Sequence, residues 1–385
     1  MHCLVVGGGI FGVTGALELR RRGHQVTLLD PGPLPHPDAS STDLSKVIRM
    51  DYGADEFYTR LMEQALDDWR ALNESFTEPL YHETGFLILS REPLEPGHFE
   101  GDSYALLTRR GHSLDRLDAK AIARRFPLWR DGGFLDGYFN ARGGWAESGR
   151  VVAALVAQAR ALGVQVREHA QVVATSESDD RVTGVRLQDG ERMAADTVVL
   201  ATGPWTTVLA PQLSGLLTTI GQPVIHLRPE QPERFASPHL VTWAADIQRT
   251  GFYGFPLNRD GLLKVANHGP GTVIDLQSER IPLIDADERF RRFLQQSLPQ
   301  LADAPIVGRR TCMYSDSRDG DFIIARDPER PGLVVAAGGS GHGFKFAPML
   351  GGFIADTVEG IDNPWCQRFA WRTAPERVYE HSRHH

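Results

Sequence analysis

The stretch 3-CLVVGGGIFGVTGALELRRRGHQVTLLD-30 decides the fold of this chain. Residues 3–6 are apolar and rich in valine, and residues 7–12 form a glycine-rich turn. Residues 13–22 follow a helical pattern, and residues 26–29 are apolar again, as in a second strand. The order strand, turn, helix, strand predicts a βαβ unit and therefore an α/β fold.

The glycine turn has the spacing G-x-G-x-x-G, with Gly7, Gly9 and Gly12 at the three glycine positions. The first glycine permits the tight turn, the second lets the backbone approach a pyrophosphate, and the third lets helix and strand pack closely. Asp30 ends the second strand, where a carboxylate accepts hydrogen bonds from a ribose 2′-hydroxyl and repels a 2′-phosphate. The pattern predicts a site for FAD or NAD, and the alternative is a glycine-rich turn that binds nothing.

The composition excludes several classes of protein. The 385 residues are 41% hydrophobic and 23% charged, with a formal net charge of -8, which is a poor match for nucleic acid. A run of about 18 apolar residues is lacking, so we expect neither a membrane span nor a signal peptide. Cys3, Cys312 and Cys366 are widely spaced and form no Cys-x-x-Cys pair. We therefore expect no disulfide framework, no metal site and a reducing, cytoplasmic location.

The βα pattern returns twice later in the chain. Residues 151–162 predict a helix that ends at Gly163, and residues 197–203 predict a buried strand that ends at a glycine. Residues 333–337 predict another strand, which a glycine-rich turn connects to a helix over residues 348–358. A dinucleotide domain built from the start, middle and end of a chain favours FAD over NAD, by analogy between folds.

We therefore expect an α/β chain with a split, Rossmann-like FAD-binding domain and an inserted, antiparallel β-rich substrate domain. The predicted FAD-binding domain comprises residues 1–78, 146–217 and 308–385, and the substrate domain comprises residues 79–145 and 218–307. The active site is expected between the two domains.

Four segments of the chain resemble those of one flavoenzyme family. The segment 338-GGSGHGFKFAP-348 closely resembles the one by which the monomeric sarcosine oxidase family holds its flavin, and 312-CMYSD-316 resembles that family's flavinylation segment. Two further pieces agree, 45-SKVIR-49 and 253-YGFP-256, the latter followed by Lys264 and His268. The resemblance extends from Gly7 to about Gly360 and implies an FAD-dependent amine oxidase.

The family resemblance also implies a covalent cofactor. In the family, the cysteine that matches Cys312 is linked through its sulfur to the 8α-methyl group of FAD. Thiolates are the nucleophilic form of cysteine, and Arg309 and Arg310 would favour one if they point inward. The alternative is that Cys312 is a small, buried, apolar side chain.

The resemblance implies roles for charged residues as well. Lys264 would lie against the flavin and promote the reduction of O2, as a fixed cation that stabilises developing negative charge. Arg49 and Lys345 would hold the substrate carboxylate, while Tyr253 and His268 would line the substrate pocket. The alternatives are that Lys264 is an outward-pointing strand residue, that Arg49 and Lys345 face solvent and that His268 is structural.

Lys46 departs from the sarcosine oxidase pattern, which has arginine at this place. The segment 40-SSTDLSKVIR-49 looks more like that of fructosyl-amino-acid and saccharopine oxidases, which carry a lysine near flavin N5. The complete set of residues expected at the cofactor is Gly7, Gly9, Ile10, Phe11, Gly12, Asp30, Ser41, Thr42, Lys46, Val172, Gly203, Trp205, Cys312, Gly341, Gly343, Phe344 and Lys345.

The implied reaction is the oxidation of secondary amines, such as N-alkyl amino acids of the sarcosine type. Hydride passes to flavin N5, the imine hydrolyses and O2 is reduced to hydrogen peroxide. Alternatives are a fructosyl-amino-acid, pipecolate or saccharopine-type oxidase, a flavin-dependent amine dehydrogenase with another electron acceptor, and a non-catalytic FAD-bound subunit. We expect a monomer whose partners are a small amine and O2, and neither nucleic acid nor a membrane.

Overall fold

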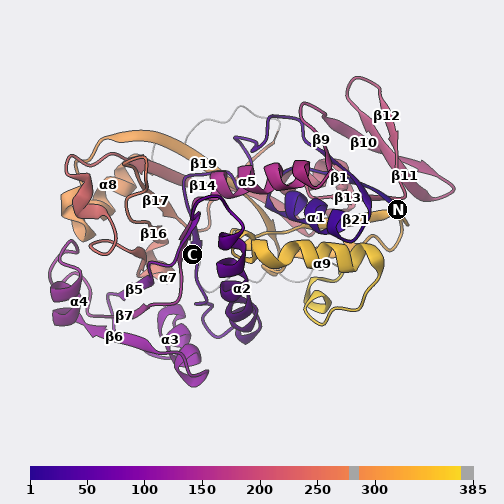
Figure 1. Ribbon diagram of the computed structural model, residues 1–385. Helices are drawn as coiled ribbons and strands as arrows, with labels where there is room; N and C mark the ends of the chain where they lie inside the picture. The colour runs from indigo at the N-terminus through magenta and orange to yellow at the C-terminus, as the bar shows by residue number, and fades with distance from the viewer. Residues whose placement is uncertain (277–285, 374–385) are drawn as a thin grey trace.

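The computed structural model describes residues 1–276 and 286–373, and two large sheets lie side by side in it (Figure 1). One sheet has six strands and is mostly parallel, whereas the other has nine strands and is mostly antiparallel. This arrangement confirms the predicted class, an α/β chain with an antiparallel β-rich part. The domain boundaries themselves stay a prediction, and their segments 277–285 and 374–385 lie outside the described residues.

The six-stranded sheet brings together the three predicted βα pieces. Its strands, in spatial order, are β20 (Ile323–Arg326), β21 (Leu333–Ala337), β13 (Thr197–Leu200), β1 (His2–Val6), β2 (Gln25–Leu29) and β9 (Gln165–Arg167). All neighbours run parallel except β20, which is antiparallel to β21. Both faces of this sheet are buried, which explains why β1 is apolar without alternation.

Different elements cover the two faces of the sheet. Cys3 and Val5 of β1 pack toward the helices α1 (Ile10–Arg21), α5 (Ser148–Ala161) and α9 (Ala347–Glu359). Leu4 and Val6 pack toward a small antiparallel sheet of β10 (Val172–Ser178), β11 (Arg181–Leu187) and β12 (Arg192–Ala194). Successive side chains of β1 therefore belong to two separate apolar cores, one on each face of the sheet.

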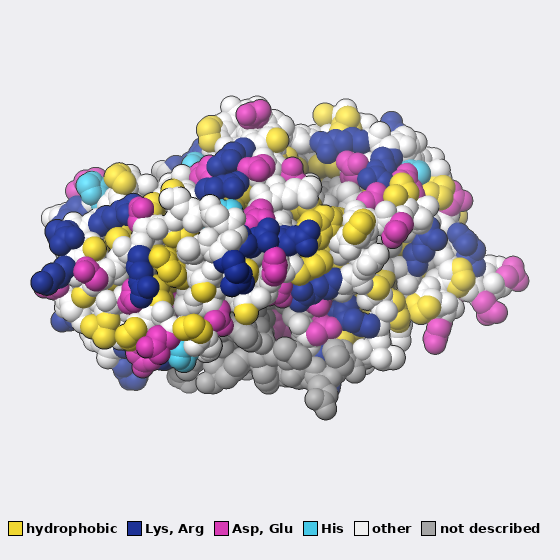
Figure 2. Space-filling model, turned by 90° about the horizontal axis from the view of Figure 1, so that it is seen from below, with side chains coloured by type: hydrophobic (Ala, Val, Ile, Leu, Met, Phe, Trp, Pro, Cys, Tyr) yellow, Lys and Arg dark blue, Asp and Glu magenta, His cyan; other side chains and the backbone are white. Residues whose placement is uncertain are grey.

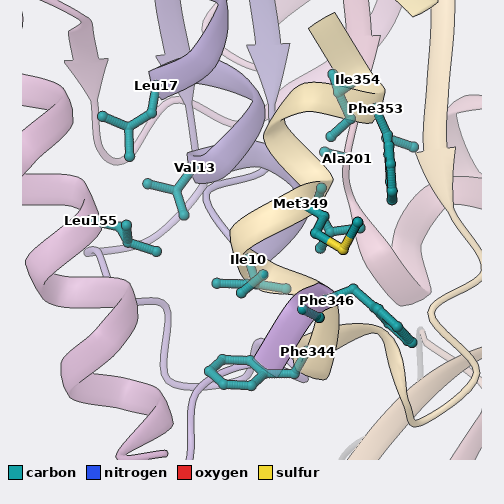
Figure 3. Packing of buried hydrophobic residues seen from close by; sticks show 14 of the residues in the cluster. Ile10, Val13, Leu17, Leu155, Ala201, Phe344, Phe346, Met349, Phe353 and Ile354 are labelled. Carbon is teal, nitrogen blue, oxygen red and sulfur yellow. The ribbon is translucent and has the colours of Figure 1, made fainter. Parts of the chain in front are cut away.

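Helix α1 lies between its two neighbouring helices (Figure 3). Val13 and Leu17 face Leu155 of α5, while Ile354 of α9 lies on the other side. The helix begins three residues before the predicted start, because Gly9 already acts as its N-cap. Its first turn is thus placed at the glycine turn.

The nine-stranded sheet forms the other half of the molecule. Its strands are β18 (Thr272–Val273), β14 (Leu217–Leu227), β17 (Leu263–Asn267), β16 (Phe252–Gly254), β15 (Thr242–Ala245), β5 (Phe86–Ser90), β7 (Asp136–Asn140) and β6 (Leu114–Asp118), with β19 (Ile306–Ser317) paired to β14. Only β15 and β5 pair in parallel among these described strands. The long pair of β14 and β19 lies near the centre of the molecule in Figure 1. Its register places Cys312 opposite Gln222.

The remaining elements surround these sheets. A small sheet consists of β3 (Lys46–Ile48), β8 (Gly144–Ala146) and β4 (Tyr81–His82). The other α-helices are α2 (Glu56–Glu74), α3 (Phe99–Arg109), α4 (Ala119–Arg125), α6 (Thr206–Leu209), α7 (Ile247–Thr250) and α8 (Ala286–Ser297). Short 3-10 turns include η1 (Gly203–Trp205) and η5 (Gly343–Phe346), which both lie at the predicted cofactor segments.

The surface carries both signs of charge. On the face that Figure 2 shows, Lys and Arg side chains are interspersed with Asp and Glu side chains. Within residues 1–276 and 286–373, no helix combines the length and hydrophobicity needed to cross a bilayer.

Candidate active site

The glycine turn connects β1 to α1 at the carboxyl edge of the parallel sheet. Gly7 has a φ of +100°, which favours glycine, and a Cβ there would lie 2.5 Å from the carbonyl oxygen of Ala201. A Cβ on Gly12 would lie 1.7 Å from the carbonyl oxygen of Gly7. At Gly9 the nearest atom would be Oγ of Ser41, at 3.4 Å. Gly7 and Gly12 therefore satisfy steric demands of the turn, whereas Gly9 leaves its backbone open to a ligand.

A large pocket of about 1370 Å³, partly open to solvent, lies at this edge of the sheet. Val6 and Ala337, the last residues of β1 and β21, contribute to its wall, as does Asp30, which follows β2. This edge is the usual place for a ligand in a parallel α/β sheet. The predicted cofactor residues found in its wall are Gly7, Gly9, Ile10, Phe11, Asp30, Ser41, Lys46, Val172, Gly203, Trp205, Gly341, Gly343 and Phe344.

The other predicted cofactor residues lie just outside this wall. Gly12 packs against Gly7, and Lys345 lines a second pocket. Thr42 has a buried hydroxyl without a hydrogen-bond partner in the described chain, and Cys312 is 2% exposed on β19.

Several residues that line the large pocket were not predicted from the sequence. They include His36, Thr202 and Tyr314. Tyr314 could have been found, because it follows Cys312 by two positions on one strand and so shares its face. Thr202 lies between the end of β13 and Gly203, a position that the strand prediction already marked. His36 lies in a proline-rich loop, where no sequence motif indicated a residue of the cofactor site.

Asp30 is held by the glycine turn rather than pointing freely into the pocket. The backbone N–H of Gly8 donates to its Oδ2 at 2.8 Å, and that of Gly32 donates to its Oδ1 at 3.0 Å. Burial raises the pKa of Asp30, although these two hydrogen bonds oppose the shift. The carboxylate thus stabilises the turn at the wall of the pocket.

The pocket fits a dinucleotide. The N-terminus of α1 has no side-chain cap and no acidic residue in its first turn, which suits a phosphate group at the positive end of the helix dipole. The wall of the pocket combines the N-terminus of α1 with the open backbone of Gly9 and with apolar side chains such as Ile10, Val172 and Phe344. This wall offers polar contacts for phosphate and ribose groups and apolar contacts for flat aromatic rings.

A second, smaller pocket of about 570 Å³ adjoins the large one. The two share Lys46, Tyr314, Gly341 and Phe344 in their walls. The smaller pocket is also lined by Arg49, Tyr253, His268 and Lys345, so the structure brings together the residues predicted at the substrate.

Arg49 is almost buried in the smaller pocket, at 6% exposure. Its guanidinium carbon lies 5.3 Å from the ring centroid of Tyr52, 5.9 Å from that of Phe86 and 5.2 Å from that of Phe99. Its Nη1 has no hydrogen-bond partner among the described residues. Lys345 is equally buried, and its Nζ lies 4.9 Å from the same Tyr52 ring. Neither cation is the solvent-facing charge of the alternative interpretation.

Lys264 is also buried, with 1% of its side chain exposed, which excludes an outward-pointing strand residue. Its Nζ lies 2.6 Å from Oδ2 of Asp43 and donates to the carbonyl oxygen of Ser45 at 2.7 Å. Burial lowers the pKa of Lys264 to about 8, although Asp43 opposes this shift. Asp43 was missed in the sequence, although it lies only three residues before Lys46 in the segment that resembles the oxidases.

The pKa of Asp43 is lowered, as expected for a carboxylate paired with a cation. Burial alone would raise it, but Lys264, a hydrogen bond from His226 and nearby Lys46 hold it well below its ordinary value. Lys46 repels Lys264 while attracting Asp43, which explains why burial prevails for the lysine and attraction prevails for the carboxylate.

The cation next to Cys312 is Lys46, and neither Arg309 nor Arg310 takes this place. Nζ of Lys46 donates to Sγ of Cys312 at 3.4 Å. Arg309 instead pairs with Asp287 at the surface, and Arg310 donates to the carbonyl oxygen of Ala39. The condition that both arginines point inward is therefore not met, because adjacent residues of β19 face opposite sides of the strand.

Tyr253 and His268 complete the smaller pocket. Burial raises the pKa of Tyr253, with the neighbouring Cys312 as a smaller cause, so its hydroxyl stays protonated near neutral pH. The ring of His268 is 6% exposed and lies 5.8 Å from the ring of Tyr314.

Comparisons with known proteins agree with this geometry. The profile of the DAO family, described as FAD dependent oxidoreductase, matches residues 2–357. L-saccharopine oxidase of Schizosaccharomyces pombe is 27% identical, over 96% of this chain and 92% of the relative. Human peroxisomal sarcosine oxidase is 30% identical, over 90% of this chain and 89% of the relative.

A solved structure is similar as well. Fructosyl amine: oxygen oxidoreductase (Amadoriase I) of Aspergillus fumigatus superposes with a TM-score of 0.83 at 27% identity, over 96% of this chain and 89% of that chain. The resemblance to sarcosine, fructosyl-amino-acid and saccharopine oxidases is thus confirmed. The chain belongs to the DAO family of FAD-dependent oxidoreductases.

Proposed function

We propose that the protein is an FAD-dependent oxidase of secondary amines that carry a carboxylate, namely N-alkyl amino acids such as sarcosine. One observation carries the proposal: Arg49 is buried beside the dinucleotide pocket with its Nη1 unpaired among the described residues. A buried guanidinium N–H without an acceptor costs free energy. A substrate carboxylate supplies that acceptor in the planar geometry that a guanidinium matches.

The smaller pocket suits the rest of such a substrate. Lys345 and Arg49 both lie near the ring of Tyr52, so an anion between them meets two positive charges. Ala244 and Ile247 offer apolar contacts for the alkyl part, and Tyr253 and His268 offer polar groups for the amine. The names of the relatives, which are oxidases of saccharopine and of sarcosine, support this substrate class.

The chain's residues orient the reaction around the cofactor. FAD, held by the glycine turn and the wall of the large pocket, would supply the two-electron acceptor for the hydride of the C–H bond next to the amine nitrogen, and O2 would regenerate it with formation of hydrogen peroxide. Lys264 places a cation where negative charge develops on O2. The substrate leaves as an imine, which water hydrolyses.

Cys312 is proposed as the covalent anchor of FAD. Its sulfur is nearly buried and receives a hydrogen bond from the ammonium of Lys46. Denaturation in acid tests the link, because covalent FAD stays with the precipitated protein.

A second candidate is a fructosyl-amino-acid, pipecolate or saccharopine-type oxidase. Lys46 at the junction of the two pockets, in place of an arginine, favours it. A flavin-dependent dehydrogenase that passes electrons to another acceptor is the remaining alternative, and slow reoxidation in air would support it.

We also propose that the protein acts as a monomer in the cytoplasm. All three cysteines are free thiols in the structure, which agrees with a reducing compartment. The monomeric state rests on the family resemblance, and sedimentation of the purified protein tests it.

Anaerobic mixing with a panel of amines tests the function. The panel contains sarcosine, N-methyl-tryptophan, iminodiacetate, pipecolate, proline and a fructosyl-amino acid, and the flavin absorbance is followed before and after air is admitted. We expect one of these amines to bleach the flavin rapidly, and air to restore the colour with formation of peroxide. Bleaching without recovery would indicate a dehydrogenase, and no bleaching by any amine would contradict the proposal.

A further inference from the structure

The buried carboxylate of Asp43 lies directly against Lys264, although no step of the proposed reaction uses it. The Asp43 side chain is 1% exposed, like that of Lys264, and their charged atoms are 2.6 Å apart. On its other side, Nε2 of His226 donates to Oδ1 of Asp43 at 3.1 Å. Oδ1 also accepts a hydrogen bond from the backbone N–H of Leu44 at 2.7 Å, whereas Oδ2 faces Lys264. Lys264 is fixed by a second contact to the backbone of Ser45.

The tertiary structure places these three side chains together. His226 of β14 and Lys264 of β17 are directly opposite in the antiparallel register, so their side chains share one face of the sheet. Asp43 comes from the segment before β3 and lies over both of them. His226 is 17% exposed and forms the outer end of the group.

The charged and titratable neighbours of this group include Tyr253, whose pKa Asp43 helps to raise. Lys264 is influenced by Asp43, Lys46 and Cys312, and the ring of Phe255 lies 5.2 Å from its Nζ. Asp43 is influenced by Lys264, His226 and Lys46. Lys46 therefore repels Lys264, and Asp43 is the carboxylate that opposes this repulsion in a site that excludes water.

We propose that Asp43, oriented by His226, is a positioning residue that keeps Lys264 protonated and holds its ammonium in place for the reaction with O2. The inference rests on the role of Lys264 proposed above. Burial already lowers the pKa of Lys264 to about 8 with Asp43 present, so loss of the carboxylate lowers it further. A neutral amine cannot stabilise negative charge on O2 as an ammonium does.

The first experiment measures the reaction with O2 alone. The holoenzyme is reduced with dithionite in the absence of any amine and then mixed with oxygenated buffer between pH 5 and 10. For the wild type we expect the rate of flavin reoxidation to fall as the pH rises through about 8. For Asp43→Asn we expect the same fall at a pH about two units lower, so that the rate at pH 7 drops about tenfold. An unchanged pH profile in Asp43→Asn would overturn the proposal.

A double variant separates an effect through Lys264 from any other effect of Asp43. Lys264→Met should react slowly at every pH, and Asp43→Asn/Lys264→Met should be no slower. A double variant slower than Lys264→Met by the full factor seen in Asp43→Asn would overturn the proposal. His226→Ala should shift the profile in the same direction as Asp43→Asn but less, and His226→Gln, which keeps an N–H donor, should shift it less than His226→Ala does.

Thermal unfolding supplies a measurement that does not depend on turnover. Asp43→Asn leaves Lys264 buried without its counter-ion, so that folding at pH 7 must either bury an unpaired charge or release the proton, and the unfolding midpoint should fall. Removal of the amino group in Asp43→Asn/Lys264→Met should raise the midpoint again. A double variant less stable than Asp43→Asn would contradict the pairing. If Asp43→Asn does not fold at pH 7, recovery of folding in the double variant supports the same conclusion, and its absence contradicts it.

Failure of this inference is distinguishable from failure of the proposed function. Dithionite reduces the flavin without an amine, so the measurements with O2 do not require the correct substrate. A flavin that no amine bleaches would contradict the amine oxidase and leave the comparison of the Asp43 and Lys264 variants unchanged.

Discussion

The two adjoining pockets are built by opposite means. The large pocket depends on the absence of side chains, because Gly7 and Gly12 have no room for a Cβ and Gly9 exposes its backbone. The smaller pocket and its surroundings depend on buried charge, with Arg49, Lys345 and Lys264 all less than one tenth exposed. The steric arrangement suits a large cofactor, and the buried charges suit the small anion of the proposed function.

Two carboxylates make the same contrast. Asp30, at the large pocket, is held by backbone N–H groups, and burial raises its pKa. Asp43, beside the smaller pocket, is paired with Lys264 and has its pKa held well below the ordinary value. An asparagine in place of Asp30 could still accept hydrogen bonds from the backbone. An asparagine in place of Asp43 would carry no charge to pair with Lys264.

The largest effect is expected from Gly12→Ala. Its Cβ would meet the carbonyl oxygen of Gly7 at 1.7 Å, so helix and turn must separate. We expect loss of FAD binding and a loss of stability of more than about 3 kcal/mol, measured by flavin content and urea unfolding. Gly352→Ala in α9 is the control, because its Cβ would meet nothing within 4 Å. It should stabilise the protein by roughly 0.5–1 kcal/mol, and equal losses in both variants would refute the steric argument.

Arg49→Met tests the electrostatic side of the comparison. A substrate carboxylate would lose its buried partner, so kcat/KM should fall about 30- to 4000-fold, the equivalent of about 2–5 kcal/mol. Rapid mixing with the amine that bleaches the wild type provides the measurement. Arg70→Met, which removes a half-exposed ion pair with Glu83, should change kcat/KM less than about fivefold. A similar loss in the two variants would argue against a carboxylate clamp.

The pH dependence of stability sharpens the contrast at Lys264. Its pKa is about 8 in the folded protein and 10.5 ordinarily, so between these values the unfolded chain binds more protons. The wild type should therefore gain up to about 3 kcal/mol relative to Asp43→Asn/Lys264→Met as the pH rises from 8 to 10.5. The lowered pKa of Asp43 has the opposite consequence in acid, where the wild type loses stability as the pH falls through 3.8 and below. Urea unfolding across this range measures both changes, and a constant difference would contradict them.

The smallest change in stability is expected from Cys312→Ala. The variant should fold with a loss of about 1 kcal/mol, because a small, nearly buried side chain is shortened by one atom. Its FAD should nevertheless be released when the protein is denatured in acid, whereas the wild-type precipitate stays yellow. Cys366→Ala, at a partly buried cysteine, should behave like the wild type. A colourless wild-type precipitate would rule out the covalent link.

Local patterns in the sequence were sufficient for the parallel half of the molecule. The glycine turn, the apolar strands and the helix starts are properties of short segments, because sterics and periodicity act over a few residues. They predicted β1, α1 and β2 closely, and β13 and β21 as buried strands. Family motifs then located Arg49, Lys345, Tyr253 and His268, which the structure gathers around one pocket.

Only the tertiary structure decided which charges meet. The contacts of Asp43 with Lys264 and His226, and of Lys46 with Cys312, join segments far apart in the chain. Strand periodicity tells which face of a strand a residue occupies, but it does not tell which residue lies opposite. Short segments of the sequence thus predicted the cofactor site. The contacts between charged side chains around Lys264 and Cys312 arose instead from the packing of segments that are far apart in the chain.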